Sequence, residues 1–387
     1  MKLKIEHLAS KLILVIAALV LAATATAQDK IKIGVLFALG GTMAFLGEPQ
    51  LNTFKMLVDE KNAKGGFSGR KIEYIVYDTE GNGTKAVQQF RRLVESDKVD
   101  VVFGPNTSAE ALLIKPLASE LQIPTMAFSG GEEVVVPVNP WVFQAVPHNR
   151  IVVNHFYDYL RKLGHKKVGL LTATDAFGQG GLNTLKQLAL NYGITIVAAE
   201  EFGNKDTDMT PQILKIKSVN PDVMIVWGLN PGPTIIMRNA KAVNFDRPIF
   251  NSNGVASPQF IAQTGAAGEG SWVSSPRLLS PDTLQSNDPA KPLVKKLFTD
   301  YSAKYKKEPA AFAAIPHDAL LVLEAAMTKV QGALTRKAIR EALEGVSNVV
   351  GANGTYTFSA ENHSGQDSKS QPMVMMKIVN GKFIAQP

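Results

Sequence analysis

The sequence predicts an α/β protein made of two similar lobes, each built on a mostly parallel sheet with helices on both faces. Two patterns and the chain length support this prediction. Short apolar runs alternate with amphipathic stretches after residue 28, and the alternation restarts after residue 148. The 387 residues also exceed one ordinary domain of roughly 100–200 residues. We therefore expect two lobes of the same architecture.

The first half of the chain is predicted to form β-α units that end on a further strand. Its strands follow from short apolar runs such as KIGVLF, and its helices from apolar residues at helical spacing, such as Leu51, Phe54 and Val58. The predicted strands are Lys32–Phe37, Lys71–Asp78, Asp100–Gly104 and Pro124–Phe128. The predicted helices are Pro49–Asn62, Thr84–Glu95 and Ala109–Leu121. This order is typical of a parallel sheet that is covered on both faces.

The second half repeats the pattern, beginning with a helix. The predicted helices are Asn149–Leu163, Gly180–Asn191, Thr210–Val219 and Thr234–Val243. The predicted strands are Lys167–Ala173, Ile194–Glu200, Asp222–Gly228 and Pro248–Asn251. Apolar runs such as DVMIVWG are too short for helices and indicate buried strands. A second lobe that resembles the first is the simplest interpretation.

The remainder of the chain is less regular. Helices are predicted for Leu293–Tyr305, Ala319–Val330 and Arg336–Leu343, and short strands for TYTF and MVMMKIV on either side of a polar loop, Ser359–Ser370. Each lobe needs a closed core, so these elements must be divided between the two lobes. The pattern alone does not divide them.

The first 27 residues indicate a signal peptide. Lys2, Lys4 and Lys11 precede an apolar run, Leu12–Ala23, and a small-residue cleavage pattern at Ala25–Ala27 follows it. A membrane anchor or a buried N-terminal helix is the alternative, but the run of about 12 residues is shorter than the roughly 20 that a spanning helix needs. No cysteine follows the run, which argues against a lipid-modified terminus. We expect export and cleavage near Ala27.

Composition and motifs argue against several classes of function. The chain has no cysteine, which excludes disulfides, thiolate catalysis and sulfur-ligated metals, and its net charge of +7 is scattered rather than gathered into a nucleic-acid surface. Phosphate-loop, dinucleotide, nucleophile-elbow and zinc-protease motifs are all missing. The sequence therefore predicts a binding protein and not an enzyme, with no catalytic residues, cofactor, metal or nucleic-acid partner. An exported enzyme of unfamiliar type is the alternative.

Candidate ligand contacts follow the ends of two neighbouring predicted strands. Asn106, Thr107 and Ser108 end one strand and begin a helix, while Ser129 and Gly130 follow the next strand. Open parallel sheets bind ligands beyond the carboxyl ends of their strands, and a helix N-terminus with exposed hydroxyls suits a carboxylate. Simple helix capping by the hydroxyls, or a turn at the glycine, is the alternative interpretation.

Three stretches resemble the periplasmic solute-binding proteins of branched-chain amino-acid ABC importers, the leucine-binding protein family. They are KIGVLFALGGTMAFLGEPQLNTFKMLVDEKNAKGGFSGRKIEYIVYDTEGN, VDVVFGPNTSAEA and KVGLLTATDAFGQGG. The resemblance implies a type I periplasmic binding protein: a periplasmic monomer of two Rossmann-like lobes that closes around a small ligand and delivers it to a membrane ABC permease. A cysteine pair known in some leucine binders is absent.

The resemblance also implies where the chain passes between the lobes. The three crossings would fall near residues 146–150, 276–280 and 345–352. Residues 28–147 and 278–347 would then form the first lobe, and residues 148–277 and 348–387 the second. This division would assign the irregular C-terminal elements of the chain to one lobe or the other.

Residue by residue, the implied binding site is only partly present. The family's carboxylate-binding hydroxyl falls on Ser108, and its backbone carboxylate contacts fall on Ser129 to Gly131. A threonine that helps hold the substrate ammonium is replaced by Gly131, and the acidic residue that pairs with the ammonium is replaced by Asn253. Positions that are aromatic in the family are Leu46, Asn230 and Phe177, the last in place of a tyrosine.

The missing acidic residue predicts a change of ligand. A closed cleft excludes water, and a buried ammonium without a carboxylate partner costs several kcal/mol. We therefore expect a carboxylate ligand without an α-ammonium, such as an aromatic or aliphatic acid, with an ordinary amino acid as the alternative. Phe45, Phe177 and Trp227 would supply apolar surface unless they only pack in the core, and Arg277 a counter-charge unless it is a solvated loop residue.

A sensory component and an exported hydrolase are the alternatives to a solute-binding function. A sensory component of similar fold would need a membrane-spanning segment, and the apolar runs after residue 28 are too short for one. An exported hydrolase would need a polar catalytic constellation, and the motif search finds none.

Overall fold

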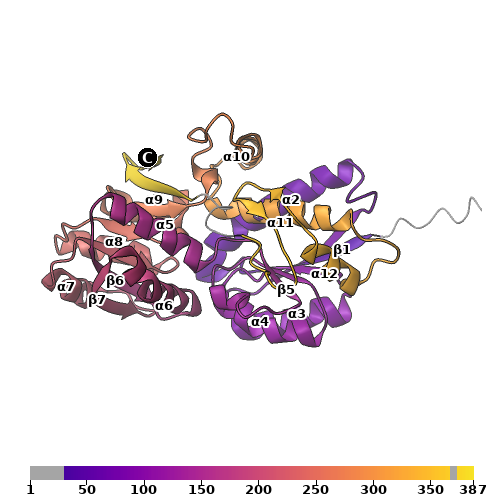
Figure 1. Ribbon diagram of the computed structural model, residues 1–387, viewed down its shortest axis with the longest axis horizontal. Coiled ribbons are helices and arrows are strands. Elements are labelled where there is room, and N and C mark those ends of the chain that lie inside the picture. The colour runs from indigo at the N-terminus through magenta and orange to yellow at the C-terminus, as the bar shows by residue number, and fades with distance from the viewer. Residues whose placement is uncertain (1–29, 367–372) are drawn as a thin grey trace, which may run out of the picture.

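The computed structural model describes residues 30–366 and 373–387 and contains two α/β lobes (Figure 1). The lobe around β1 lies on the right of the figure and the lobe around β6 on the left. The predicted signal peptide and the end of the predicted polar loop lie outside the described residues. Within the described ranges, no helix is both long and apolar enough to cross a bilayer.

The first lobe contains a five-stranded parallel sheet in the order β2-β1-β3-β4-β5. Its strands are β1 (Ile31–Phe37), β2 (Ile72–Asp78), β3 (Val101–Phe103), β4 (Thr125–Ala127) and β5 (Val142–Gln144). In β1, Ile33 and Val35 face one core while Leu36 faces another, as expected for a strand that is buried on both faces. The sequence did not predict β5, because a 3-10 turn rather than a helix connects it to β4.

Helices cover both faces of this sheet. The two cores of the lobe include residues of α2 and α11 on one face, such as Phe54 and Leu320, and residues of α3 and α4 on the other, such as Phe90 and Ile114. The helices are α2 (Ala44–Ala63), α3 (Gly83–Arg91), α4 (Ser108–Glu120), α11 (Ala314–Met327) and α12 (Arg336–Glu344). Short turns are η1 (Gly41–Met43), the π-helical η2 (Arg92–Ser96), η3 (Glu132–Val134) and η8 (Ala311–Ala313).

The second lobe contains a seven-stranded sheet in the order β14-β13-β10-β9-β8-β6-β7. Its strands are β6 (Lys167–Ala173), β7 (Thr195–Phe202), β8 (Val223–Trp227), β9 (Ile249–Asn251), β10 (Trp272–Ser275), β13 (Val374–Val379) and β14 (Lys382–Ala385). The last two strands are antiparallel to their neighbours, and the others are parallel. The predicted fold class of two mostly parallel lobes is confirmed.

Helices again lie on both faces. The two cores of this lobe take residues from α5 and α6 on one side of the sheet and from α7 and α8 on the other. The helices are α5 (Asn149–Lys162), α6 (Ala176–Ala189), α7 (Thr210–Ser218), α8 (Gly232–Ala242) and α9 (Pro258–Thr264). Short turns are η4 (Leu190–Tyr192), η5 (Asn253–Val255), η6 (Gly265–Ala267) and η7 (Arg277–Leu279), and α10 (Lys291–Tyr305) follows.

The chain passes between the two lobes near β5 and β10. The chain leaves the first sheet after β5 for α5, and it leaves the second sheet after β10 at η7. A small hairpin of β11 (Val349–Val350) and β12 (Thr355–Tyr356) follows α12, and Tyr356 and Phe358 lie in the core of the first lobe. The hairpin therefore belongs to the first lobe and does not form the crossing expected at residues 345–352.

This hairpin is held by Asp318, a fully buried residue of α11. Its carboxylate accepts hydrogen bonds from the backbone N–H of Ala352 at 2.6 Å and of Asn353 at 2.8 Å, and from the Tyr356 hydroxyl at 3.0 Å. A Cβ on Gly351 would lie 2.5 Å from the Asp318 carboxyl carbon, so only glycine fits at that position. A buried carboxylate is tolerated where several donors satisfy it. Asp318 therefore fixes the hairpin against α11.

We predict that Asp318→Asn lowers the free energy of unfolding by about 3 kcal/mol, because an amide N–H would face a backbone donor in a buried position. Urea unfolding followed by circular dichroism measures this change. Glu324→Gln is the matched control, since Glu324 lies on the same helix in a partly exposed ion pair with Lys61 and such pairs contribute about 1 kcal/mol or less. Equal losses in the two variants would contradict this role of Asp318.

Candidate ligand-binding site

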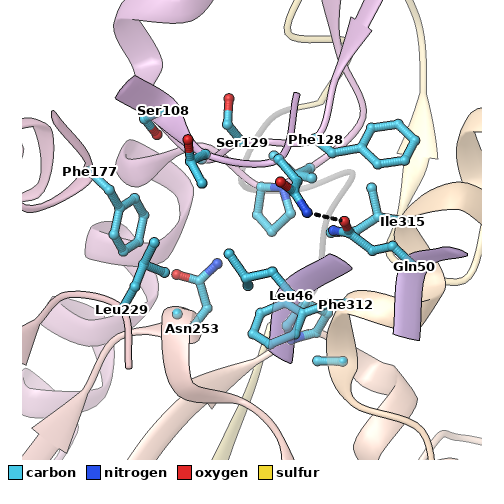
Figure 2. A pocket seen from close by; sticks show the side chains of 18 of the residues that line it. Leu46, Gln50, Ser108, Phe128, Ser129, Phe177, Leu229, Asn253, Phe312 and Ile315 are labelled. Carbon is cyan, nitrogen blue, oxygen red and sulfur yellow. Dashed lines mark hydrogen bonds between the residues drawn. The ribbon is translucent and has the colours of Figure 1, made fainter. Parts of the chain in front are cut away.

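A cavity of about 590 Å³, including its opening to solvent, lies between the two lobes. Both lobes and the crossings contribute to its wall: Figure 2 shows Ser108 and Ser129 of the first lobe on one side and Asn253 and Leu229 of the second lobe on the other.

The structure brings most of the predicted ligand contacts together at this cavity. Those that line it are Leu46, Asn106, Thr107, Ser108, Ser129, Gly130, Phe177 and Asn253. Three predicted contacts are not part of the lining. Gly131 donates its N–H to the Ser108 hydroxyl, Phe45 packs edge-on against Phe312 with ring centres 5.9 Å apart, and the Asn230 amide accepts a hydrogen bond from Thr234 at the start of α8.

The N-terminus of α4 forms one end of the cavity. Thr107 caps this helix: its Oγ1 accepts the Glu110 N–H at 3.3 Å and donates to the Glu110 carboxylate at 2.7 Å. The capping alternative therefore holds for Thr107. Ser108 differs, because its Oγ accepts the Gly131 N–H at 3.1 Å and keeps its own proton free to donate. Ser108 thus offers a hydroxyl donor beside the positive end of the helix.

The loop after β4 lies next to this helix, and the Gln144 side chain fixes its position. Gln144 Nε2 donates to the carbonyl oxygens of Ser129 at 2.5 Å and Gly131 at 3.1 Å. The N–H groups of Ser129 and Gly130 donate to none of the described residues. The Ser129 hydroxyl is also buried, with the residue 3% exposed, and has no hydrogen-bond partner. This loop therefore presents free donors beside Ser108.

The cavity wall carries no formal charge. Among the described residues that line it, none has a titratable side chain. Asn253 is the first residue of η5, and its Oδ1 is buried without a partner among the described residues. Burial raises the pKa of Glu110 and lowers the pKa of His148, which favours the neutral form of each of these neighbours of the lining.

The rest of the wall is largely apolar. Leu46 and Phe312 come from the first lobe and Phe177 and Leu229 from the second, on opposite sides of the cavity (Figure 2). Trp227 is fully buried behind Phe177, with ring centres 5.8 Å apart, so its alternative role in core packing holds.

Arg277 does not reach the cavity either. It is buried and forms two hydrogen bonds with Asp288, at 2.8 and 3.1 Å. The counter-charge expected from this arginine is therefore absent, because Asp288 already neutralises it.

Sequence reasoning missed more than half of the lining. The residues missed are Gln50, Phe128, Val146, Pro147, Leu229, Gly254, Pro276, Ala311, Phe312, Ile315 and Asn353. Gln50 gave a usable signal, because a glutamine lies among apolar residues of a predicted helix and is almost fully buried in the structure. Asn353 gave none, because its position depends on how the hairpin packs against α11.

Two lobes, chain crossings between them and an uncharged cavity at their junction define a two-lobed binding protein that encloses a small ligand. A family model described as periplasmic binding protein matches residues 30–382, and the chain belongs to this family. The resemblance noted from the sequence is confirmed.

The chain is similar to named relatives over nearly its whole length. It is 26% identical to the Leu/Ile/Val-binding protein BraC3 of Rhizobium johnstonii, over 93% of this chain and 94% of that protein. Among solved structures, an extracellular ligand-binding receptor from Rhodopseudomonas palustris HaA2 is 27% identical, with a TM-score of 0.84 over 93% of this chain and 100% of that one. The substrate-binding protein LivJ from Streptococcus pneumoniae, in complex with isoleucine, is 26% identical, with a TM-score of 0.81 over 92% and 99%.

We predict that Ser129→Ala leaves the stability of the unliganded protein unchanged or raises it slightly, because the Ser129 hydroxyl is buried without a partner. Thr107→Ala should instead lower the free energy of unfolding by about 1 kcal/mol, through loss of the helix cap. Chemical denaturation of the two variants measures both effects. A loss at Ser129 as large as the loss at Thr107 would show that the Ser129 hydroxyl supports the fold.

Proposed function

We propose that the chain is the substrate-binding component of an ABC importer of the branched-chain amino-acid type, acting in the periplasm. Its ligand is a small carboxylic acid without an α-ammonium group, aromatic or aliphatic. The observation that carries this proposal is a cavity with free hydrogen-bond donors at one end and no titratable side chain among its described lining residues. The relatives and the predicted signal peptide support transport and export.

The carboxylate would bind at the α4 end of the cavity. The hydroxyls of Ser108 and Ser129 and the N–H of Gly130 are directed donors, and the helix N-terminus adds a partial positive charge. An anion at this place needs no counter-charged side chain, since backbone and hydroxyl donors together satisfy its oxygens.

An α-ammonium would lack a partner of opposite charge. Asn253 Oδ1 and the cavity's carbonyl groups accept hydrogen bonds, but neither neutralises a charge. In a closed cleft the uncompensated charge costs several kcal/mol. An acid that carries hydrogen in place of the ammonium avoids this cost and gains from the apolar surface of Leu46, Phe177 and Phe312.

Transport requires that the ligand favour the closed form. Contacts from both lobes stabilise closure only when the ligand touches both, and the cavity wall includes Ser108 from one lobe and Asn253 from the other. The ligand shifts the equilibrium by its difference in affinity for the closed and open forms. The membrane permease then recognises the closed form.

An ordinary branched-chain amino acid is the second candidate. Two relatives favour it, because BraC3 is named a Leu/Ile/Val-binding protein and the LivJ structure holds isoleucine. The two candidates differ only in the ammonium group and therefore in the need for a negative charge near Asn253.

We predict that Asn253→Glu creates leucine binding, with an affinity at least about tenfold above that of the wild type, because a carboxylate would pair with the ammonium. Asn253→Gln, of the same length but neutral, should give no gain. Isothermal titration calorimetry measures the affinity of the wild type and of both variants for leucine. Tight leucine binding by the wild type, or equal affinities in the Glu and Gln variants, would overturn the proposed ligand class while leaving the transport role intact.

A further inference from the structure

Asn353 is a polar side chain that borders the cavity and has no evident use in the fold. It follows β11 in the hairpin and is fully buried. Its backbone N–H donates to Asp318 at 2.8 Å, but neither atom of its side-chain amide has a hydrogen-bond partner among the described residues. A buried polar group left unpaired costs about 1–3 kcal/mol, and folded proteins contain few of them. A group that enters the cavity would remove this cost.

The neighbours of Asn353 leave its side-chain amide unpaired. The Tyr356 hydroxyl is already shared between Asp318 at 3.0 Å and the Ala145 carbonyl at 3.1 Å. Among the described residues, none donates to the Asn353 Oδ1, which is therefore a free acceptor.

A free donor lies on the same side of the cavity. Asn353 is bound to Asp318, one helical turn after Ile315 on α11, so it borders the wall to which Ile315 belongs. Figure 2 shows Gln50 beside Ile315, across the cavity from Phe177. The Gln50 Oε1 accepts from Asn106 at 2.9 Å, whereas Gln50 Nε2 has no partner among the described residues. This wall thus combines a neutral acceptor with a neutral donor.

We propose that Asn353 and Gln50 form a second polar subsite, which binds a hydroxyl group at the end of the ligand remote from its carboxylate. A hydroxyl donates one hydrogen bond and accepts others, so it satisfies both amides. Neither a second carboxylate nor an ammonium fits, because the described lining has no charge to balance it. This inference rests on the proposed function and narrows its ligand class to hydroxy acids with the two groups at opposite ends.

The test compares acids that differ only in this hydroxyl. Isothermal titration calorimetry of the full mature chain would use 3-phenylpropionate against 3-(4-hydroxyphenyl)propionate, and hexanoate against 6-hydroxyhexanoate. The wild type should prefer the hydroxylated acid by about tenfold or more in at least one pair, since unpaired polar groups of a site reject a ligand that cannot satisfy them. This comparison needs no variant and is independent of how a substitution affects folding.

Two variants then test whether Asn353 causes the preference for the hydroxylated acid. Asn353→Leu keeps the side-chain volume and should abolish the preference, while the affinity for the unsubstituted acid stays within about threefold. Asn183→Leu is the control, an amide-to-leucine change at an exposed position of α6 outside the cavity lining, and should keep the preference. A preference that survives Asn353→Leu, or its absence in the wild type for both pairs, overturns the subsite. If the wild type binds none of the four acids, the proposed function itself fails.

Discussion

The arrangement of the cavity depends on one buried carboxylate. Asp318 collects two backbone N–H groups and the Tyr356 hydroxyl, and Tyr356 in turn reaches the carbonyl of Ala145 at the first crossing. One side chain thereby ties the α11 wall of the cavity, the hairpin after α12 and the start of the hinge into a single unit. The carboxylate must keep these donors because it is cut off from water. The position of Asn353 at the cavity is a consequence of this requirement.

The cavity shows how binding specificity follows from charge rather than from shape alone. Its α4 end offers donors without a counter-ion, which suits an anion, and its remaining surface is apolar or carries neutral amides. Burying a charged ligand group against an uncharged wall costs free energy unless hydrogen-bond donors or acceptors of the protein surround that group. On the proposed function, Asn253 is therefore the position at which the absence of an acidic side chain changes the class of ligand.

Local sequence patterns predicted the regular part of the fold well. Strands such as β1 and β6 and helices such as α4 and α5 follow from apolar periodicity. The elements missed, including β5, α9, β10 and β14, are short or lack the alternation of strand and helix that marks the others. The third crossing was misplaced because nothing local in the sequence shows that Tyr356 and Phe358 complete the first lobe's core.

Some residues of the site could be predicted from the sequence, and others could not. Ser108, Ser129 and Gly130 could be found because they follow strand ends in a parallel sheet, where ligands bind. Gln50, Ile315 and Asn353 come from helices and a hairpin far apart in the chain, and only the tertiary packing brings them to one wall. Phe45 was expected to offer apolar surface and Asn230 was expected from the resemblance, but Phe45 packs against Phe312 and Asn230 bonds to Thr234 of α8.

The central claim is that this protein binds acids without an α-ammonium. The most direct measurement is a thermal-shift screen of residues 28–387 against leucine, valine and glutamate on one side and benzoate, phenylpropanoid and short aliphatic acids on the other. A ligand at one hundred times its dissociation constant stabilises the protein by about 2.7 kcal/mol, or at least a degree or two in Tm. We predict shifts in Tm with acids of the second group only. A shift with leucine or valine and none with the acids would contradict it.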